Sequence, residues 1–107
     1  MIKEFESIVT KEELQNEIAA GVVMIDFFSK TCGPCKMLAF ILKDIDKTMG
    51  EQVKFVKIPF EDNPDLVKEY GVEGYPTIIM MKDGKELSRK AGLQQKPTIV
   101  NMINEAL

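Results

Sequence analysis

The strongest constraint on the fold is an apolar segment that leads directly into a pair of cysteines. Residues Val22–Phe28 are apolar at six of seven positions, which is typical of a strand covered on both faces. The tetrapeptide Cys32-Gly33-Pro34-Cys35 follows, and from Leu38 apolar residues recur at the helical spacing i, i+3, i+4, i+7 and i+11 up to Gly50. We therefore expect a central strand, a turn that carries the cysteines, and the longest helix of the chain, with Pro34 in its first turn.

The remaining patterns predict an α/β fold, a mixed sheet with helices on both faces. Thr10 and Glu13 form a capping-box pattern, and Leu14 and Ile18 follow at helical spacing before Gly21. The other expected strands lie at 2–5, 53–58, 77–81 and 86–91, and the last two flank the hairpin signal Asp83-Gly84. The other expected helices run from an Asn63 N-cap and Pro64 to Gly71, and from about Pro97 to Leu107.

Length and charge limit the possible classes of protein. A chain of 107 residues with 45% apolar residues fits one domain, residues 1–107. A net charge of −3 without a basic cluster argues against nucleic acid as a partner. No apolar stretch approaches the roughly 20 residues that cross a bilayer, and the first residues lack the apolar core of a signal peptide. We expect no membrane partner and a cytoplasmic location.

The residue types that are absent restrict the chemistry to the cysteine pair. The chain has no histidine, no tryptophan and two cysteines, which excludes a serine triad and the usual cysteine-protease dyad. Two thiolates cannot complete a zinc site that needs about four ligands, so no metal is expected. The pair could be half a metal site completed by a second subunit, or chemically idle. A CxxC between a strand and a helix favours redox chemistry.

The two cysteines are expected to play different parts. Cys32 lies at a helix N-terminus, where partial positive charge and free N–H groups favour thiolate over thiol. Lys30 and Lys36 add positive charge nearby. We therefore predict that Cys32 is the nucleophile and that Cys35, one turn inside the helix, is the less exposed resolving thiol.

These motifs together resemble the thioredoxin family. The resemblance rests on Cys32-Gly33-Pro34-Cys35-Lys36, on Asp26-Phe27 before it, and on Tyr75-Pro76-Thr77 and Gly92 after it, and it extends over nearly the whole chain. It implies a thioredoxin fold in which Cys32 attacks, Cys35 resolves, Asp26 is a buried carboxylate and Pro76 is a cis-proline that faces the disulfide.

Asp26 is the only charged residue in its apolar strand, and a buried carboxylate must raise its pKa or find a partner. Lys57 is the expected partner. The pair could be purely structural. In the catalytic interpretation, Asp26 takes the proton from Cys35 through a water as that thiol attacks the mixed disulfide.

A substrate surface is expected around the sulfurs. Pro76 could be an ordinary turn proline, whereas the family resemblance implies a cis bond that lets Tyr75 pair with an extended substrate segment. The expected rim consists of Thr31, Gly33, Pro34, Gly74, Tyr75, Pro76 and Gly92. Thr31 and Phe28 stand where the family usually has tryptophan. Phe40 replaces the usual kinking proline, so the helix should be straighter.

The resemblance implies a protein disulfide reductase that cycles between a Cys32/Cys35 dithiol and disulfide, with a role in electron transport and cell redox homeostasis. No bound cofactor is expected. The expected partners are disulfide-containing substrate proteins and a separate thioredoxin reductase, flavoprotein or ferredoxin-linked, and the protein should be a monomer. The alternatives are an oxidase or isomerase on the same fold, disfavoured by Gly33-Pro34, and a binding subunit in which the dithiol is incidental.

Overall fold

The structure, a computed structural model, describes residues 1–107. Its elements follow the predicted order β-α-β-α-β-α-β-β-α. They are β1 (Ile2–Glu4), α1 (Lys11–Ile18), β2 (Val22–Phe28), α2 (Gly33–Met49), β3 (Lys54–Pro59), α3 (Pro64–Glu69), β4 (Thr77–Lys82), β5 (Lys85–Ala91) and α4 (Lys96–Ala106). None of the helices combines the length and the apolar composition that a membrane span requires.

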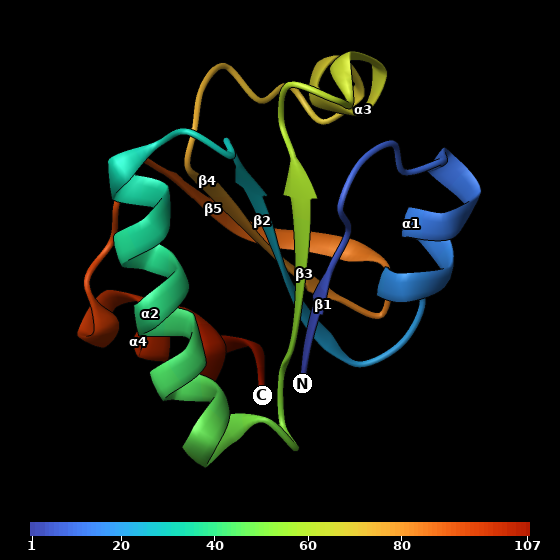
Figure 1. Ribbon diagram of the computed structural model, residues 1–107. Helices are drawn as coiled ribbons and strands as arrows, with labels where there is room; N and C mark the ends of the chain where they lie inside the picture. The colour runs from blue at the N-terminus through green and yellow to red at the C-terminus, as the bar shows by residue number, and fades with distance from the viewer.

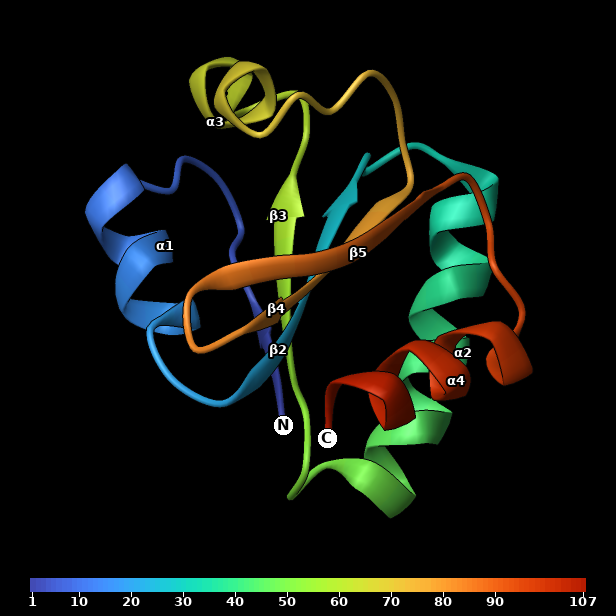
Figure 2. The ribbon, with the colours of Figure 1, turned by 180° about the vertical axis from the view of Figure 1, so that it is seen from behind.

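The five strands form one mixed sheet in the order β1-β3-β2-β4-β5, with β2 in the centre as predicted. β3 runs parallel to β1 and β2, whereas β4 runs antiparallel to β2 and β5. Helices α2 and α4 cover one face of the sheet, and α1 and α3 lie on the other side (Figures 1 and 2). The prediction of helices on both faces is confirmed.

Alternation along β2 divides the core between the two faces of the sheet. Val23, Ile25 and Phe27 pack in the cluster that contains residues of α1 and α3. Met24 packs in the cluster that contains residues of α2 and α4. Asp26 lies two residues after Met24 on β2, so its carboxylate faces α2, the helix that begins at the cysteines.

Local sequence signals explain several boundaries. The capping box at α1 is present, because the Glu13 N–H donates to Thr10 Oγ1 and the Thr10 N–H donates to Glu13 Oε1, both at 3.0 Å. The hairpin turn has positive φ at both central residues, 48° at Asp83 and 83° at Gly84, as a two-residue type I′ turn requires. α2 continues without interruption through Phe40.

Asn63 is the N-cap residue of α3 and the helix begins at Pro64, as predicted. The Asn63 side chain, however, makes no capping hydrogen bond. Its buried amide oxygen accepts from the Val9 N–H at 2.7 Å, and its Nδ2 donates to the carbonyls of Ser7 and Pro59. A buried amide is best satisfied by several partners, and here the partners come from the loop before α1 and from the end of β3.

Candidate active site

The cysteines and Pro76 lie at the same end of the sheet. β2 leads into the cysteine loop, and its residue Phe27 pairs with Thr77 at the start of antiparallel β4. Pro76 therefore precedes β4 at the end where β2 leads into the cysteine loop. The Gly92 N–H donates to the Pro76 carbonyl at 2.7 Å, which holds the chain after β5 against the segment before β4.

Cys32 and Cys35 form a disulfide at the N-terminus of α2, with their Cα atoms 5.2 Å apart. Cys32 is the N-cap residue, and its Sγ accepts the Cys35 N–H at 3.2 Å. Cys32 is 8% exposed and Cys35 3%, so both are largely covered and Cys32 is the more accessible. An N–H directed at Cys32 Sγ, together with the helix N-terminus, stabilises a thiolate at that atom.

Ser29, which no sequence pattern indicated, contacts both cysteines. Its N–H donates to Cys35 Sγ at 3.5 Å, and its carbonyl accepts the Cys32 N–H at 3.4 Å. Its hydroxyl donates to Glu61 Oε2 at 2.7 Å and accepts the Thr31 N–H at 3.4 Å. This nearly buried serine therefore links the loop of the disulfide to the segment after β3.

Glu61 and Asp62 anchor the cysteine loop from that segment. The hydrogen bond from Ser29 is the main cause that holds the pKa of Glu61 below its ordinary value. The Lys30 ammonium lies 2.7 Å from Asp62 Oδ2. The positive charge expected from Lys30 is thus neutralised by a neighbouring carboxylate, whereas Lys36 is in no ion pair.

Asp26 is fully buried, and neither of its oxygens accepts a hydrogen bond from the protein. Burial raises its pKa to about 7, against the opposing effect of the positive charge of Lys57. Lys57, the expected partner of Asp26, lies opposite it in the register of β2 and β3. Its ammonium, however, lies 3.1 Å from Glu4 Oε1 and 4.9 Å from the centre of the Phe28 ring.

A small hollow of about 120 Å³ lies next to Cys35. Cys35 and Lys57 both line it, and Asp26 does not. The other lining residues are Glu4, Phe28, Ser29, Lys30, Lys36 and Ala39. Because one water occupies about 30 Å³ in the liquid, the hollow has room for water between Cys35 and the Lys57 ammonium.

The Tyr75–Pro76 peptide is cis, which confirms the expectation from the family resemblance. Pro76 is buried, and the half-exposed Tyr75 packs edge to face on Phe60 with ring centroids 5.1 Å apart. The Thr77 hydroxyl donates to the Gly74 carbonyl at 2.8 Å. Of the other expected rim residues, Gly74 is half-buried, and the exposed ones are Thr31, Gly33, Pro34 and Gly92.

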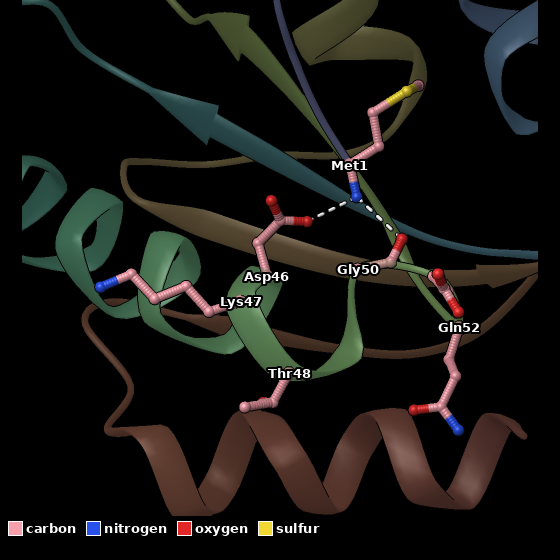
Figure 3. Close-up of a pocket in the computed structure, with 7 residues that line it drawn as sticks. Met1, Asp46, Lys47, Thr48, Gly50 and Gln52 are labelled. Atoms are coloured by element: carbon pink, nitrogen blue, oxygen red, sulfur yellow. Dashed lines mark hydrogen bonds and ion pairs between the residues drawn. The ribbon is translucent and has the colours of Figure 1, made fainter.

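The largest hollow of the protein lies elsewhere, at the C-terminal end of α2. It measures about 630 Å³, and Met1 is its only apolar lining residue. The amino group of Met1 binds Asp46 and the Gly50 carbonyl there (Figure 3). It contains no cysteine. We therefore take the cysteine loop, where the disulfide lies, as the candidate active site.

Comparisons with known proteins show the family of the chain. Residues 5–105 match the thioredoxin family model. The chain is 40% identical over 98 residues to a thioredoxin of Chlamydia caviae, covering 92% of this chain and 95% of that protein. It is 36% identical over 98 residues to a thioredoxin of Bacillus subtilis, covering 92% and 94%.

A solved structure gives the same result for the fold. A single-substitution mutant of a thioredoxin from Halobacterium salinarum superposes with a TM-score of 0.87 and 26% identity, over 98% of this chain and 89% of that chain. With a disulfide at the predicted pair, the comparisons do not favour the oxidase, isomerase or binding-subunit alternatives. The chain therefore belongs to the thioredoxin family and is a thiol–disulfide oxidoreductase that reduces disulfide-containing substrate proteins and receives its electrons from a reductase.

Proposed function

We propose that residues 1–107 form a single thioredoxin domain in which Cys32 and Cys35 act in sequence. The Cys32 thiolate attacks one sulfur of the substrate disulfide, which forms a mixed disulfide and releases the other substrate sulfur as a thiolate. Cys35 then attacks Cys32 Sγ, which releases the second substrate thiol. The substrate gains two electrons and two protons, and the protein is left with the Cys32–Cys35 disulfide.

The proposed order of attack rests on the different surroundings of the two sulfur atoms. Cys32 Sγ accepts an N–H at the helix N-terminus and is the more exposed of the two. Cys35 is more deeply covered and lines the hollow toward Lys57. The first sulfur is suited to attack on an external disulfide, and the second is suited to the intramolecular step.

Asp26 would accept the proton that Cys35 must lose before it attacks. A carboxyl with a pKa of about 7 exchanges protons readily near neutral pH. Water in the hollow next to Cys35 would carry the proton, passing Lys57 to reach Asp26. Lys57 would stabilise the carboxylate while Asp26 is ionised, because its positive charge opposes the effect of burial on the Asp26 pKa.

The substrate would lie across the rim formed by Thr31, Gly33, Pro34, Gly74, Tyr75, Pro76 and Gly92. Because the cis bond before Pro76 lies at the same end of the sheet as the cysteine loop, the Tyr75 backbone could pair with an extended segment next to the substrate disulfide. Three rim residues are glycines, which leave room for a second backbone to approach.

The reaction needs no bound cofactor, since the electrons pass between sulfur atoms. A separate flavoprotein or ferredoxin-linked reductase would regenerate the dithiol. We propose further that the protein works as a monomer in the cytoplasm, with neither nucleic acid nor membrane as a partner. The net charge of −3 supports the exclusion of nucleic acid.

Trapping of the mixed disulfide tests the assigned roles. Cys35→Ser removes the intramolecular exit, so covalent adducts with substrate proteins should accumulate on non-reducing gels and collapse with dithiothreitol. Cys32→Ser is the matched control and should give few adducts, because the remaining sulfur is covered. Equal yields from the two variants would contradict the order of attack, and no adducts from either would contradict the reductase mechanism.

A further inference from the structure

The outward face of α2 carries two large apolar side chains close to the disulfide. Phe40 is 72% exposed and Met37 is 56% exposed. The helix turns Leu38, Leu42 and Ile45 toward the core instead. Met37 and Phe40 are three residues apart and are therefore neighbours on the helix surface. We call this pair the α2 ridge.

Unpaired lysines border the α2 ridge. Three lysines lie on the same side of the helix as Phe40. Lys36 is four residues before Phe40, Lys43 is three residues after it, and Lys47 is seven residues after it. None of them is in an ion pair, and Figure 3 shows Lys47 directed away from the Met1 amino group. Acidic Asp44 is paired with Lys96 at 2.6 Å. This face is locally positive in a chain of net charge −3.

The α2 ridge lies on the helix that begins at the disulfide, and Met37 is only two residues after Cys35. Phe40 follows Cys32 by eight residues, which is about 12 Å along a helix axis. A standard interface buries about 800 Å² per partner, equivalent to a disc of about 16 Å radius. A partner protein that brings its disulfide to Cys32 and extends along α2 would therefore cover Phe40.

We propose that the α2 ridge and its lysines form a docking surface for substrate proteins whose disulfide is flanked by an apolar side chain and acidic residues. Contact with Phe40 and Met37 removes apolar surface of both partners from water. Attraction to Lys43 and Lys47 selects acidic over basic flanks and speeds the encounter. The proposal rests on Cys32 as the attacking thiol and adds a preference among substrates.

Short disulfide peptides provide the probe. Each contains an intramolecular disulfide and a six-residue flank, and the flanks differ only in carrying Phe and two Glu, Phe and two Lys, or Ser and two Glu. Single-turnover reduction by the reduced protein gives a second-order rate constant for each peptide. The parent should reduce the Phe/Glu peptide about tenfold faster than either of the others.

Two sets of variants separate the apolar contribution from the charges. Phe40→Ser should remove the advantage of Phe over Ser, and Lys43→Gln with Lys47→Gln should remove the advantage of Glu over Lys. The controls are Leu87→Ser, which changes a 51% exposed side chain near the hairpin turn at the opposite end of the sheet, and Lys82→Gln with Lys85→Gln at that turn. The controls should keep both preferences.

The small neutral probe 2-hydroxyethyl disulfide reports the thiol chemistry alone. All these variants should reduce it within twofold of the parent rate. The docking proposal is overturned if Phe40→Ser keeps the full preference for the Phe/Glu peptide over the Ser/Glu peptide. It is also overturned if Phe40→Ser slows the reduction of 2-hydroxyethyl disulfide by the same factor as the reduction of the Phe/Glu peptide. A parent protein that cannot reduce 2-hydroxyethyl disulfide would overturn the roles of the cysteines, and this proposal with them.

Discussion

Two carboxylates near the disulfide have opposite surroundings. Asp26 is fully buried on β2 and accepts no hydrogen bond, and burial raises its pKa to about 7. Glu61 is exposed after β3, and its pKa lies below the ordinary value, chiefly because the Ser29 hydroxyl donates to it. Glu61 contacts the cysteine loop through Ser29, whereas Asp26 lies on the face of the sheet that α2 covers.

The same functional group has different chemical properties at the two positions because its surroundings differ. A carboxyl that titrates near pH 7 can exchange a proton during turnover, at a cost in stability. A carboxylate with a lowered pKa stays ionised and can serve as a fixed acceptor for the loop. Asp26 is therefore suited to proton transfer and Glu61 to positioning, and the following substitutions test this division.

The largest effect is expected for Asp26→Asn, which should fold more stably but react more slowly. The pKa of Asp26 is about 7 in the folded protein, whereas that of a free aspartate in the unfolded chain is about 4. Ionisation of the buried carboxyl therefore lowers the free energy of unfolding by about 4 kcal/mol above pH 7. The buried amide of the variant loses about 1–3 kcal/mol for lack of partners, so a gain of about 1–3 kcal/mol is expected at pH 8. Disulfide reduction should slow about tenfold or more at neutral pH.

The sign of the pH dependence follows from the raised pKa. The folded parent keeps the Asp26 proton that the unfolded chain loses, so the parent should lose stability relative to Asp26→Asn as pH rises from about 4 to about 7. Urea unfolding at several pH values measures the difference in stability between the parent and the variant. Insulin reduction over pH 6 to 9 measures the rate of disulfide reduction. An unchanged pH–rate profile would contradict the acid–base role.

A smaller effect is expected for Lys57→Gln, which removes the charge that opposes the raised pKa of Asp26. The pKa of Asp26 should rise further, so less carboxylate is available at pH 7. We expect disulfide reduction to slow severalfold at pH 7 and to recover at higher pH. NMR titration of the Asp26 side-chain carboxyl measures the pKa directly, and a fall in that pKa would contradict the stated influence of Lys57.

Glu61→Gln should have a weaker effect, with the opposite dependence on pH. The loss in the free energy of unfolding should stay below about 1 kcal/mol, because Glu61 is solvated. A carboxylate with a lowered pKa stabilises the fold above the unfolded pKa of about 4, and this contribution is lost as pH falls through the folded pKa. The parent and Glu61→Gln should thus differ at pH 7 and converge in acid.

Ser29→Ala acts on the same hydrogen bond from the other side, because it removes the donor hydroxyl, whereas Glu61→Gln removes the charge of the acceptor. The losses of the two substitutions should be less than additive in urea unfolding, because both weaken the Ser29–Glu61 interaction. Additive losses would show that Ser29 and Glu61 act independently.

The smallest effect is expected for Glu4→Gln. Glu4 raises the pKa of Asp26 through its negative charge and pairs with Lys57. Its removal should lower the Asp26 pKa, as seen by the same NMR titration, and change stability by less than about 0.5 kcal/mol, since Glu4 is half exposed. A rise in the pKa would contradict the electrostatic link between Glu4 and Asp26.

The sequence predicted the elements and the reactive pair because both depend on short patterns. The apolar run at 22–28, the cysteine spacing and the Asp83-Gly84 turn each lie within a few residues. The contacts that it did not predict join distant positions. Ser29 meets Glu61 across 32 residues and Asn63 meets Val9 across 54. Glu4 reaches Lys57 only because β1 pairs with β3 in one register, and no local pattern encodes that register.

The composition of β5 affects how copies of this protein behave toward one another. β5 is an outer strand of the sheet, and such strands expose backbone groups that can pair with a second sheet. Most of its residues are charged, namely Lys85, Glu86, Arg89 and Lys90, and a register irregularity interrupts its pairing with β4 between Met80 and Met81. Charge and irregularity both oppose edge-to-edge association. The other outer strand, β1, is three residues long, so neither edge offers a long, uncharged template for aggregation.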